Sequence, residues 1–151
     1  MRYSEIHGDL WQMPDSYYLA HCISADFAMG AGIALQFQKR LQTKTRLCQK
    51  YGNRVTTWQC EQKFPGGPGE CLLEGRVLNL VTKQYYYQKP TVQTMRNALM
   101  SMRNLCVLHN IHKIAMPRIG CGLDKMSWPV VSKMVQDVFA GEDIDIVVCV
   151  Q

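Results

Sequence analysis

The sequence predicts a layered α/β domain, and three observations support this fold class. Short apolar runs that suit buried strands alternate along the chain with segments whose apolar residues recur at helical spacing. The length of 151 residues matches one domain with a sound hydrophobic core. Two glycine-bearing loops follow predicted strands, where open α/β sheets bind ligands. We therefore expect residues 1–151 to form a single domain.

In the first half of the chain, we expect a strand before Asp9 and a second, central strand in the apolar run 17–23. A helix follows from about residue 31, and another is predicted over 43–51, because Gly52-Asn53 stops it. The Pro- and Gly-rich segment 64–69 is predicted to be a surface loop, since these residues support neither a strand ladder nor a stable helix.

The second half is predicted to alternate strands and helices in the same way. The elements, in chain order, are a strand over 76–82, a helix over 91–110, a strand over 113–116, a helix from about 127, and a strand over 144–150. Thr91 and Ser127 can cap the two helices, because a hydroxyl oxygen accepts a hydrogen bond from a first-turn N–H. Pro117 stops the strand before it.

Composition narrows the class of protein. The chain is 47% hydrophobic and 19% charged, and neither a membrane-spanning window nor the apolar core of a signal peptide is present, so we expect an intracellular protein. Seven cysteines without a Cys-x-x-Cys pair predict neither a zinc site nor a redox motif. His109 and His112 lack a third metal ligand nearby. The net charge of +5 favours an anionic partner without identifying it.

Each glycine-bearing loop can approach a phosphate. Gly30-Ala31-Gly32 opens a predicted helix and Gly120-Cys121-Gly122 precedes one. Glycine lets backbone amides come close to a phosphate, and a helix N-terminus adds oriented N–H groups with a partial positive charge. Two such loops facing each other can hold a pyrophosphate from both sides. The same glycines also fit tight structural turns, because neither loop has the lysine of a P-loop or the full Rossmann spacing.

Lys83 and Asp124 each lie at a predicted strand end or just after one, so both can project into the same cleft. A neutral lysine amine is a nucleophile toward the anomeric carbon of a sugar, and a carboxylate can carry the protons of that step. A neighbouring aspartate and a bound pyrophosphate would, however, favour the protonated lysine. The alternative is a solvated surface lysine.

Four further sites carry two interpretations each. Asp9 can accept from an adenine amino group or cap a turn, and Ser24 can donate to a ribose or phosphate oxygen or act as a cap. The run Tyr85-Tyr86-Tyr87 can stack on a base or protein substrate, or divide between core and surface. Cys121 near a helix start suggests a nucleophile, but a small loop residue between glycines is an adequate explanation.

Together these residues resemble the macrodomains of the terminal ADP-ribose protein glycohydrolase type. The matching blocks occur in the family's order from near residue 3 to the C-terminus. They are Gly8-Asp9-Leu10, Ala20-His21-Cys22-Ile23-Ser24, Met29-Gly30-Ala31-Gly32-Ile33-Ala34, Val81-Thr82-Lys83, Lys89-Pro90-Thr91 and Met116-Pro117-Arg118-Ile119-Gly120-Cys121-Gly122-Leu123-Asp124.

The resemblance implies a three-layer α/β/α macrodomain with a central mixed sheet and a deep cleft for ADP-ribose. It implies that Lys83 attacks the distal ribose to give a lysyl–ADP-ribose adduct, and that Asp124 assists proton transfer and release. No metal or cofactor is implied. The implied substrate-binding residues are Asp9, Leu10, His21, Ser24, Met29, Gly30, Ala31, Gly32, Ile33, Thr82, Pro117, Arg118, Ile119, Gly120, Cys121, Gly122 and Leu123.

The resemblance also implies the partners. They are mono-ADP-ribosylated proteins modified on glutamate or aspartate, O-acyl-ADP-ribose, and ADP-ribosylated nucleic-acid ends, bound by a monomer. Two alternatives remain, namely a non-catalytic reader of ADP-ribose and a basic nucleic-acid-binding module. The chain departs from the family in its three tyrosines, where relatives are more basic and polar, in an apparent insertion at 64–69, and at Cys149, where an aromatic residue would enclose the adenine.

Overall fold

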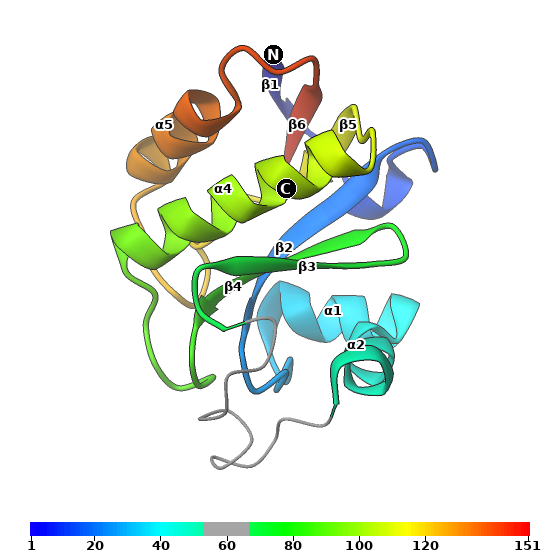
Figure 1. The fold of residues 1–151 in the computed structure, drawn as a ribbon, viewed down its shortest axis with the longest axis vertical. Helices are drawn as coiled ribbons and strands as arrows, with labels where there is room; N and C mark the ends of the chain where they lie inside the picture. Colours follow the sequence, from blue (N-terminus) through cyan, green and yellow to red (C-terminus); the bar gives the residue numbers. More distant parts are fainter. Residues whose placement is uncertain (53–66) are drawn as a thin grey trace.

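The computed structural model describes residues 1–52 and 67–151 and shows six strands in one mixed sheet (Figure 1). The strands are β1 (Arg2–His7), β2 (Tyr18–Ser24), β3 (Glu70–Glu74), β4 (Val77–Lys83), β5 (Lys113–Met116) and β6 (Asp145–Val150). Their order is β1-β6-β5-β2-β4-β3, and every neighbouring pair is parallel except β3 with β4. This arrangement confirms the predicted mixed sheet.

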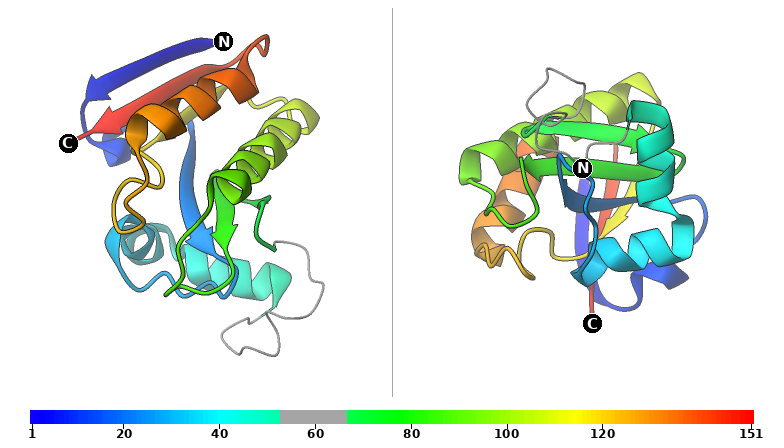
Figure 2. Two further views of the ribbon diagram at one scale, coloured as in Figure 1. Left: turned by 90° about the vertical axis from the view of Figure 1, so that its left-hand side faces the viewer. Right: turned by 90° about the horizontal axis from the view of Figure 1, so that it is seen from below.

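Helices cover both faces of the sheet (Figure 2). They are the 3₁₀ helix η1 (Leu10–Gln12) and the α-helices α1 (Gly32–Leu41), α2 (Thr43–Tyr51), α4 (Val92–Leu108) and α5 (Trp128–Phe139). Helices α4 and α5 pack against one apolar cluster and α1 and α2 against the other. The three-layer prediction is therefore confirmed. None of the described helices combines the length and apolar character needed to cross a bilayer.

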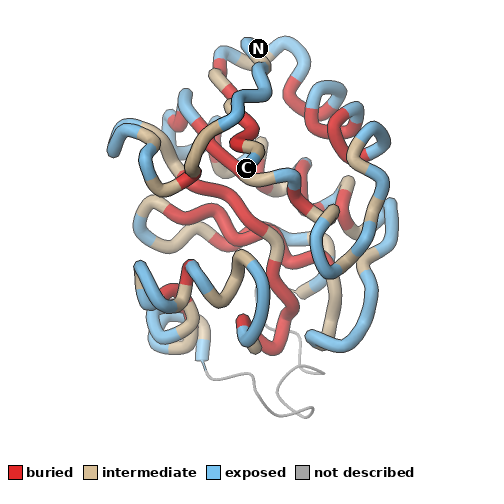
Figure 3. The backbone as a smooth tube through the Cα atoms, turned by 180° about the vertical axis from the view of Figure 1, so that it is seen from behind, coloured by how far each residue is buried: buried red, intermediate tan, exposed pale blue. Residues whose placement is uncertain are grey.

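The strand period of two residues explains why the sheet has an apolar cluster on each side. In β2, Ala20 belongs to the cluster under α4 and α5, whereas Leu19 and Ile23 belong to the cluster under α1 and α2. These residues on the two faces of β2 are almost fully buried. The central strands are therefore apolar on both faces, as parallel strands usually are (Figure 3).

Most predicted elements lie close to their observed bounds, and the differences have local causes. Thr91 caps α4 as expected, because its Oγ1 accepts from the backbone N–H of Thr94 at 3.0 Å. Ser127 occupies the cap position of α5, but its side chain makes no capping bond to the described residues. Strand β3 was not delimited from the sequence. Of the predicted loop 64–69, Pro68 and Gly69 form a turn, whereas residues 64–66 lie outside the described part.

The sheet order also sets the position of a cleft. From the end of β2 the chain passes to α1 on one face, whereas β4 and β5, which flank β2, lead to α4 and α5 on the other face. Loops that leave neighbouring parallel strands in opposite directions open a crevice at the carboxyl ends of those strands. The site is expected there.

Candidate active site

A cavity of about 750 Å³ lies at the carboxyl ends of β2 and β4, beside the start of α1 and the loop after β5. Its volume is within the range of small-molecule sites. The described lining consists of Cys22, Ile23, Ser24, Ala28, Met29, Gly30, Ala31, Gly32, Ile33, Ala34, Lys83, Tyr86, Pro117, Arg118, Ile119, Gly120, Gly122, Leu123 and Asp124. The cavity therefore brings together both glycine-bearing loops and both predicted catalytic side chains.

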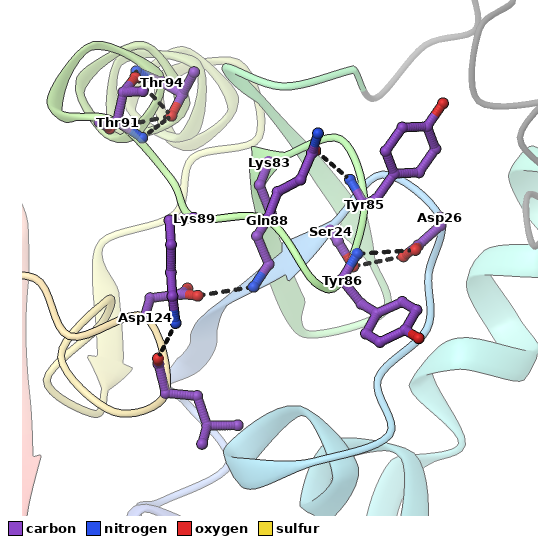
Figure 4. A network of polar contacts seen from close by, with 11 residues as sticks. Ser24, Asp26, Lys83, Tyr85, Tyr86, Gln88, Lys89, Thr91, Thr94 and Asp124 are labelled. Carbon is purple, nitrogen blue, oxygen red and sulfur yellow. Dashed lines mark hydrogen bonds and ion pairs between the residues drawn. The ribbon is translucent and has the colours of Figure 1, made fainter.

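Lys83 and Asp124 meet in this cavity. The Nζ of Lys83, at the end of β4, donates a hydrogen bond to Oδ1 of Asp124 in the β5–α5 loop at 2.7 Å (Figure 4). The two side chains are only 15% and 13% exposed, so neither is a solvated surface charge. Residues 41 positions apart thus form a partly enclosed amine–carboxylate pair, at the distance over which a proton can pass directly.

The glycine-bearing loops approach each other across the cavity. Gly32 has φ +59°, and a Cβ there would lie 3.3 Å from Cδ1 of Leu123 in the opposite loop. Gly120 has φ +74°, and a Cβ there would lie 2.8 Å from Cε of Met95. Both positions combine a left-handed backbone with a close neighbour, which explains why glycine occupies them.

The two loops offer different groups to a ligand. Gly32 is the first residue of α1, a helix of ten residues, so the unpaired first-turn N–H groups of α1 lie beside the cavity. The second loop precedes a helix as predicted, but α5 begins only at Trp128. The run 120–122 can therefore offer turn amides, and it does not lie at a helix N-terminus.

Five predicted contact residues lie outside the described lining of the cavity: Asp9, Leu10, His21, Thr82 and Cys121. Asp9 caps η1, where its Oδ1 accepts from the N–H of Trp11 at 3.0 Å, which is the turn-cap interpretation. Leu10, the first residue of η1, packs in the core, and Thr82 is fully buried in β4.

His21 is also a core residue rather than a cavity residue. Its ring stacks on that of Phe37, with the centroids 3.8 Å apart, and its Nε2 lies 2.6 Å from Oδ1 of Asn79. Burial lowers the pKa of His21 to about 4, so the ring is neutral at pH 7. The strand period places it on the face covered by α1.

The cysteines near the site are neutral thiols. Cys22 lines the cavity, and burial raises the pKa of its thiol well above the usual range. Burial also raises the pKa of Cys121, which donates from Sγ to the carbonyl of Ile119. Since thiolates are the nucleophilic form, the geometry favours Lys83 over either cysteine. Among the described residues, no three His, Cys, Asp or Glu side chains gather as a metal site.

Ser24 differs from the sequence expectation in the direction of its hydrogen bond. Its Oγ donates to Oδ1 of Asp26 at 2.5 Å, so the proton that was expected to reach a ribose or phosphate oxygen is directed to Asp26. Asp26 is a site residue that the sequence interpretation missed. The available signal was an aspartate two residues after a strand end, at a position where an aspartate commonly accepts from an N–H group two residues on.

The loop between β4 and α4 is bonded to both neighbouring loops, which the sequence interpretation also missed. The N–H of Tyr86 donates to Oδ2 of Asp26 at 3.0 Å, and Nζ of Lys89 donates to the carbonyl oxygen of Leu123 at 2.7 Å (Figure 4). Tyr86 lines the cavity, and Tyr86 and Tyr87 are 65% and 69% exposed. The tyrosine run is therefore at the rim of the cavity, with none of its members in the core.

Comparison with known proteins relates this geometry to a family. No protein-family model matches the chain. Over 148 residues, however, the chain is 38% identical to ADP-ribose glycohydrolase OARD1 from Homo sapiens, in a match that covers 97% of this chain and 90% of the human protein. A match of this identity and coverage establishes common descent over nearly the whole chain.

Solved structures show the same fold. The macrodomain of Mycobacterium tuberculosis DarG superposes with a TM-score of 0.77 at 22% identity, covering 97% of this chain and 96% of that one. Thermosipho africanus DarTG in complex with ADP-ribose superposes with a TM-score of 0.71 at 16% identity, covering 99% of this chain and 42% of that one. With the sequence relationship, these similarities show that the chain belongs to the macrodomain family that includes the OARD1 ADP-ribose glycohydrolases.

Proposed function

We propose that this protein is an ADP-ribose glycohydrolase that removes terminal mono-ADP-ribose from glutamate and aspartate side chains, with Lys83 as the nucleophile. The observation that carries the proposal is the 2.7 Å contact between Nζ of Lys83 and Oδ1 of Asp124 inside a cavity of about 750 Å³. The relationship to a protein named ADP-ribose glycohydrolase supports the same reaction.

The cavity suits a diphosphate between two sugars. The first-turn N–H groups of α1 and the amides of the 120–122 turn lie on its two sides, and both are donors for phosphate oxygens. A diphosphate bound there places one attached ribose toward Lys83. The lysine can then reach the anomeric carbon of that distal ribose.

The chemical step follows from the two side chains. The lone pair of Nζ of Lys83 attacks the anomeric carbon, and the bond from that carbon to the acceptor's ester oxygen breaks, so the acceptor leaves as a carboxylate with the bonding pair. Asp124 takes the proton that Nζ must lose. Water then cleaves the lysyl–ADP-ribose bond with Asp124 transferring protons, which releases ADP-ribose and restores the amine. The same attack accounts for two further proposed substrates. They are O-acyl-ADP-ribose with the acyl group on the anomeric oxygen, from which a carboxylate leaves, and nucleic-acid ends linked to the anomeric carbon through a phosphate, from which the phosphate leaves with the bonding pair.

The test is release of ADP-ribose from a glutamate-modified protein by wild type and Lys83→Ala. We expect the substitution to lower the release rate at least about a thousandfold, because it removes the nucleophile. Binding of ADP-ribose, measured by calorimetry, should change little, because the amine acts mainly in the transition state. Lys133→Ala, at an exposed lysine of α5, is the matched control and should release ADP-ribose at the wild-type rate.

The outcomes separate the three functions. Normal turnover by Lys83→Ala contradicts the lysine mechanism. Binding without release by the wild type indicates a non-catalytic reader. Absence of binding at millimolar ADP-ribose rejects both macrodomain functions and leaves the basic nucleic-acid-binding module.

A further inference from the structure

The carboxylate of Asp26 joins two segments of the cavity wall, the β2–α1 loop and the β4–α4 loop (Figure 4). Its Oδ1 accepts from Oγ of Ser24 at 2.5 Å and from the backbone N–H of Ala28 at 3.0 Å. Its Oδ2 accepts from the backbone N–H of Tyr86 at 3.0 Å. Asp26 is 6% exposed, and Ser24, Ala28 and Tyr86 all line the cavity.

These bonds fix the direction of the hydroxyl proton of Ser24. A backbone N–H can only donate, so the bonds from Ala28 and Tyr86 make both oxygens of Asp26 acceptors. In the short contact between Asp26 and Ser24, the hydroxyl must therefore supply the proton. The hydroxyl has one proton and two lone pairs, so toward the cavity it offers lone pairs only.

An oxygen that only accepts selects its ligand by chemistry. Phosphate and carboxylate oxygens are acceptors themselves and gain no hydrogen bond from Ser24, whereas a sugar hydroxyl can donate to it. Ser24 is paired in register with Lys83 between β2 and β4, so it lies at the lysine end of the cavity. The sugar nearest Lys83 in the proposed function is the distal ribose.

The loop that holds Asp26 has little freedom to readjust. Phe27 and Met29 have φ of 58° and 48°, which is unusual for residues other than glycine, and the two residues are 0% and 5% exposed. Such a backbone persists only when its surroundings over-determine it. The acceptor direction of Ser24 is therefore set before a ligand binds.

We propose that Asp26 is a positioning residue that makes Ser24 an obligate hydrogen-bond acceptor, and that Ser24 thereby selects substrates with a free hydroxyl on the distal ribose. The proposal rests on the proposed function, because it places the distal ribose beside Lys83. Distal riboses whose donating hydroxyl is capped or replaced are bound less well.

The experiment measures binding of ADP-ribose and two analogues in which fluorine replaces the 2″- or the 3″-hydroxyl of the distal ribose. Fluorine has a similar size but cannot donate. We expect wild type to bind one analogue about tenfold more weakly than ADP-ribose, the factor that one lost hydrogen bond represents. Ser24→Ala should bind ADP-ribose and that analogue within about twofold of each other, because it lacks the acceptor oxygen.

Asp26→Ala tests the positioning role. Alanine offers no side-chain acceptor, so the hydroxyl of Ser24 is released from its fixed direction and can donate as well as accept. We expect this variant to lose the tenfold preference. The matched control is Asp15→Ala at a fully exposed aspartate, which should retain the preference.

The outcomes are distinguishable. Failure of wild type to bind ADP-ribose overturns both this inference and the proposed function. Equal binding of all three ligands by wild type, or an intact preference in Ser24→Ala, overturns this inference alone. Should thermal unfolding show that Asp26→Ala does not fold, the comparison of wild type with Ser24→Ala decides.

Discussion

Among single residues, His21 lies on β2 near the site, but its side chain is buried in the core. The side-chain N–H groups of Asn79 donate to the carbonyls of Leu72 and Val77, so its Oδ1 is left to accept from Nε2 of His21. Nδ1 of His21 is buried and has no hydrogen-bond partner among the described residues. Burial lowers the pKa of His21, because the charged ring would lose its hydration, and the second proton would also be a buried donor without a described acceptor.

This histidine predicts a pH-dependent stability. Its pKa falls from 6.5 to about 4 on folding, so between these values the unfolded chain binds the proton and the folded protein does not. The stability is complete above pH 6.5 and declines as the pH falls toward about 4, by about 3 kcal/mol at ~1.4 kcal/mol per pH unit. Denaturant unfolding of wild type and His21→Gln across pH 4–7 measures the difference. Equal pH slopes in the two proteins would contradict the assignment.

Among the elements, the loop after β5 contains two glycines with different roles, one in the local backbone conformation and one in the cavity. Gly120 is crowded by Met95 of α4, whereas a Cβ at Gly122 would meet no described atom within 4 Å. Both glycines line the cavity. The first is therefore required by local structure, and the second leaves room for a ligand to approach the backbone.

Gly120 and Gly122 give a matched test of how each glycine contributes to stability. We expect Gly120→Ala to lower the free energy of unfolding by about 1–3 kcal/mol, because the backbone at φ +74° is strained for a residue with a Cβ and the end of the Met95 side chain must also move. Gly122→Ala should change it by less than ~0.5 kcal/mol. Denaturant titration of both variants measures the difference. Equal destabilisation by the two substitutions would show that the crowding at Gly120 is unimportant.

In the molecule as a whole, the strand order of the sheet brings segments that are far apart in the sequence together at the site. The helix 43–51 and the strand 113–116 were predicted with their observed bounds, because clear stops and apolar patterns delimit them. The meeting of Lys83 and Asp124 was also predictable, since both follow strand ends at one edge of a parallel sheet. The role of Asp26 was not predictable, because its hydrogen bond with Tyr86 joins residues 60 positions apart and depends on how two loops pack.

The proposed mechanism requires that Lys83 becomes covalently attached to the distal ribose while Asp124 transfers the protons for release. Intact-protein mass spectrometry of Asp124→Ala, incubated with a glutamate-modified substrate, detects this covalent attachment. We expect a mass increase of one ADP-ribose that maps to Lys83, because solvent can take the proton of the amine slowly in place of Asp124, whereas release stalls without the carboxylate. The double variant that also carries Lys83→Ala should gain no mass. Unchanged turnover by Asp124→Ala, with no adduct on Lys83, would contradict the account.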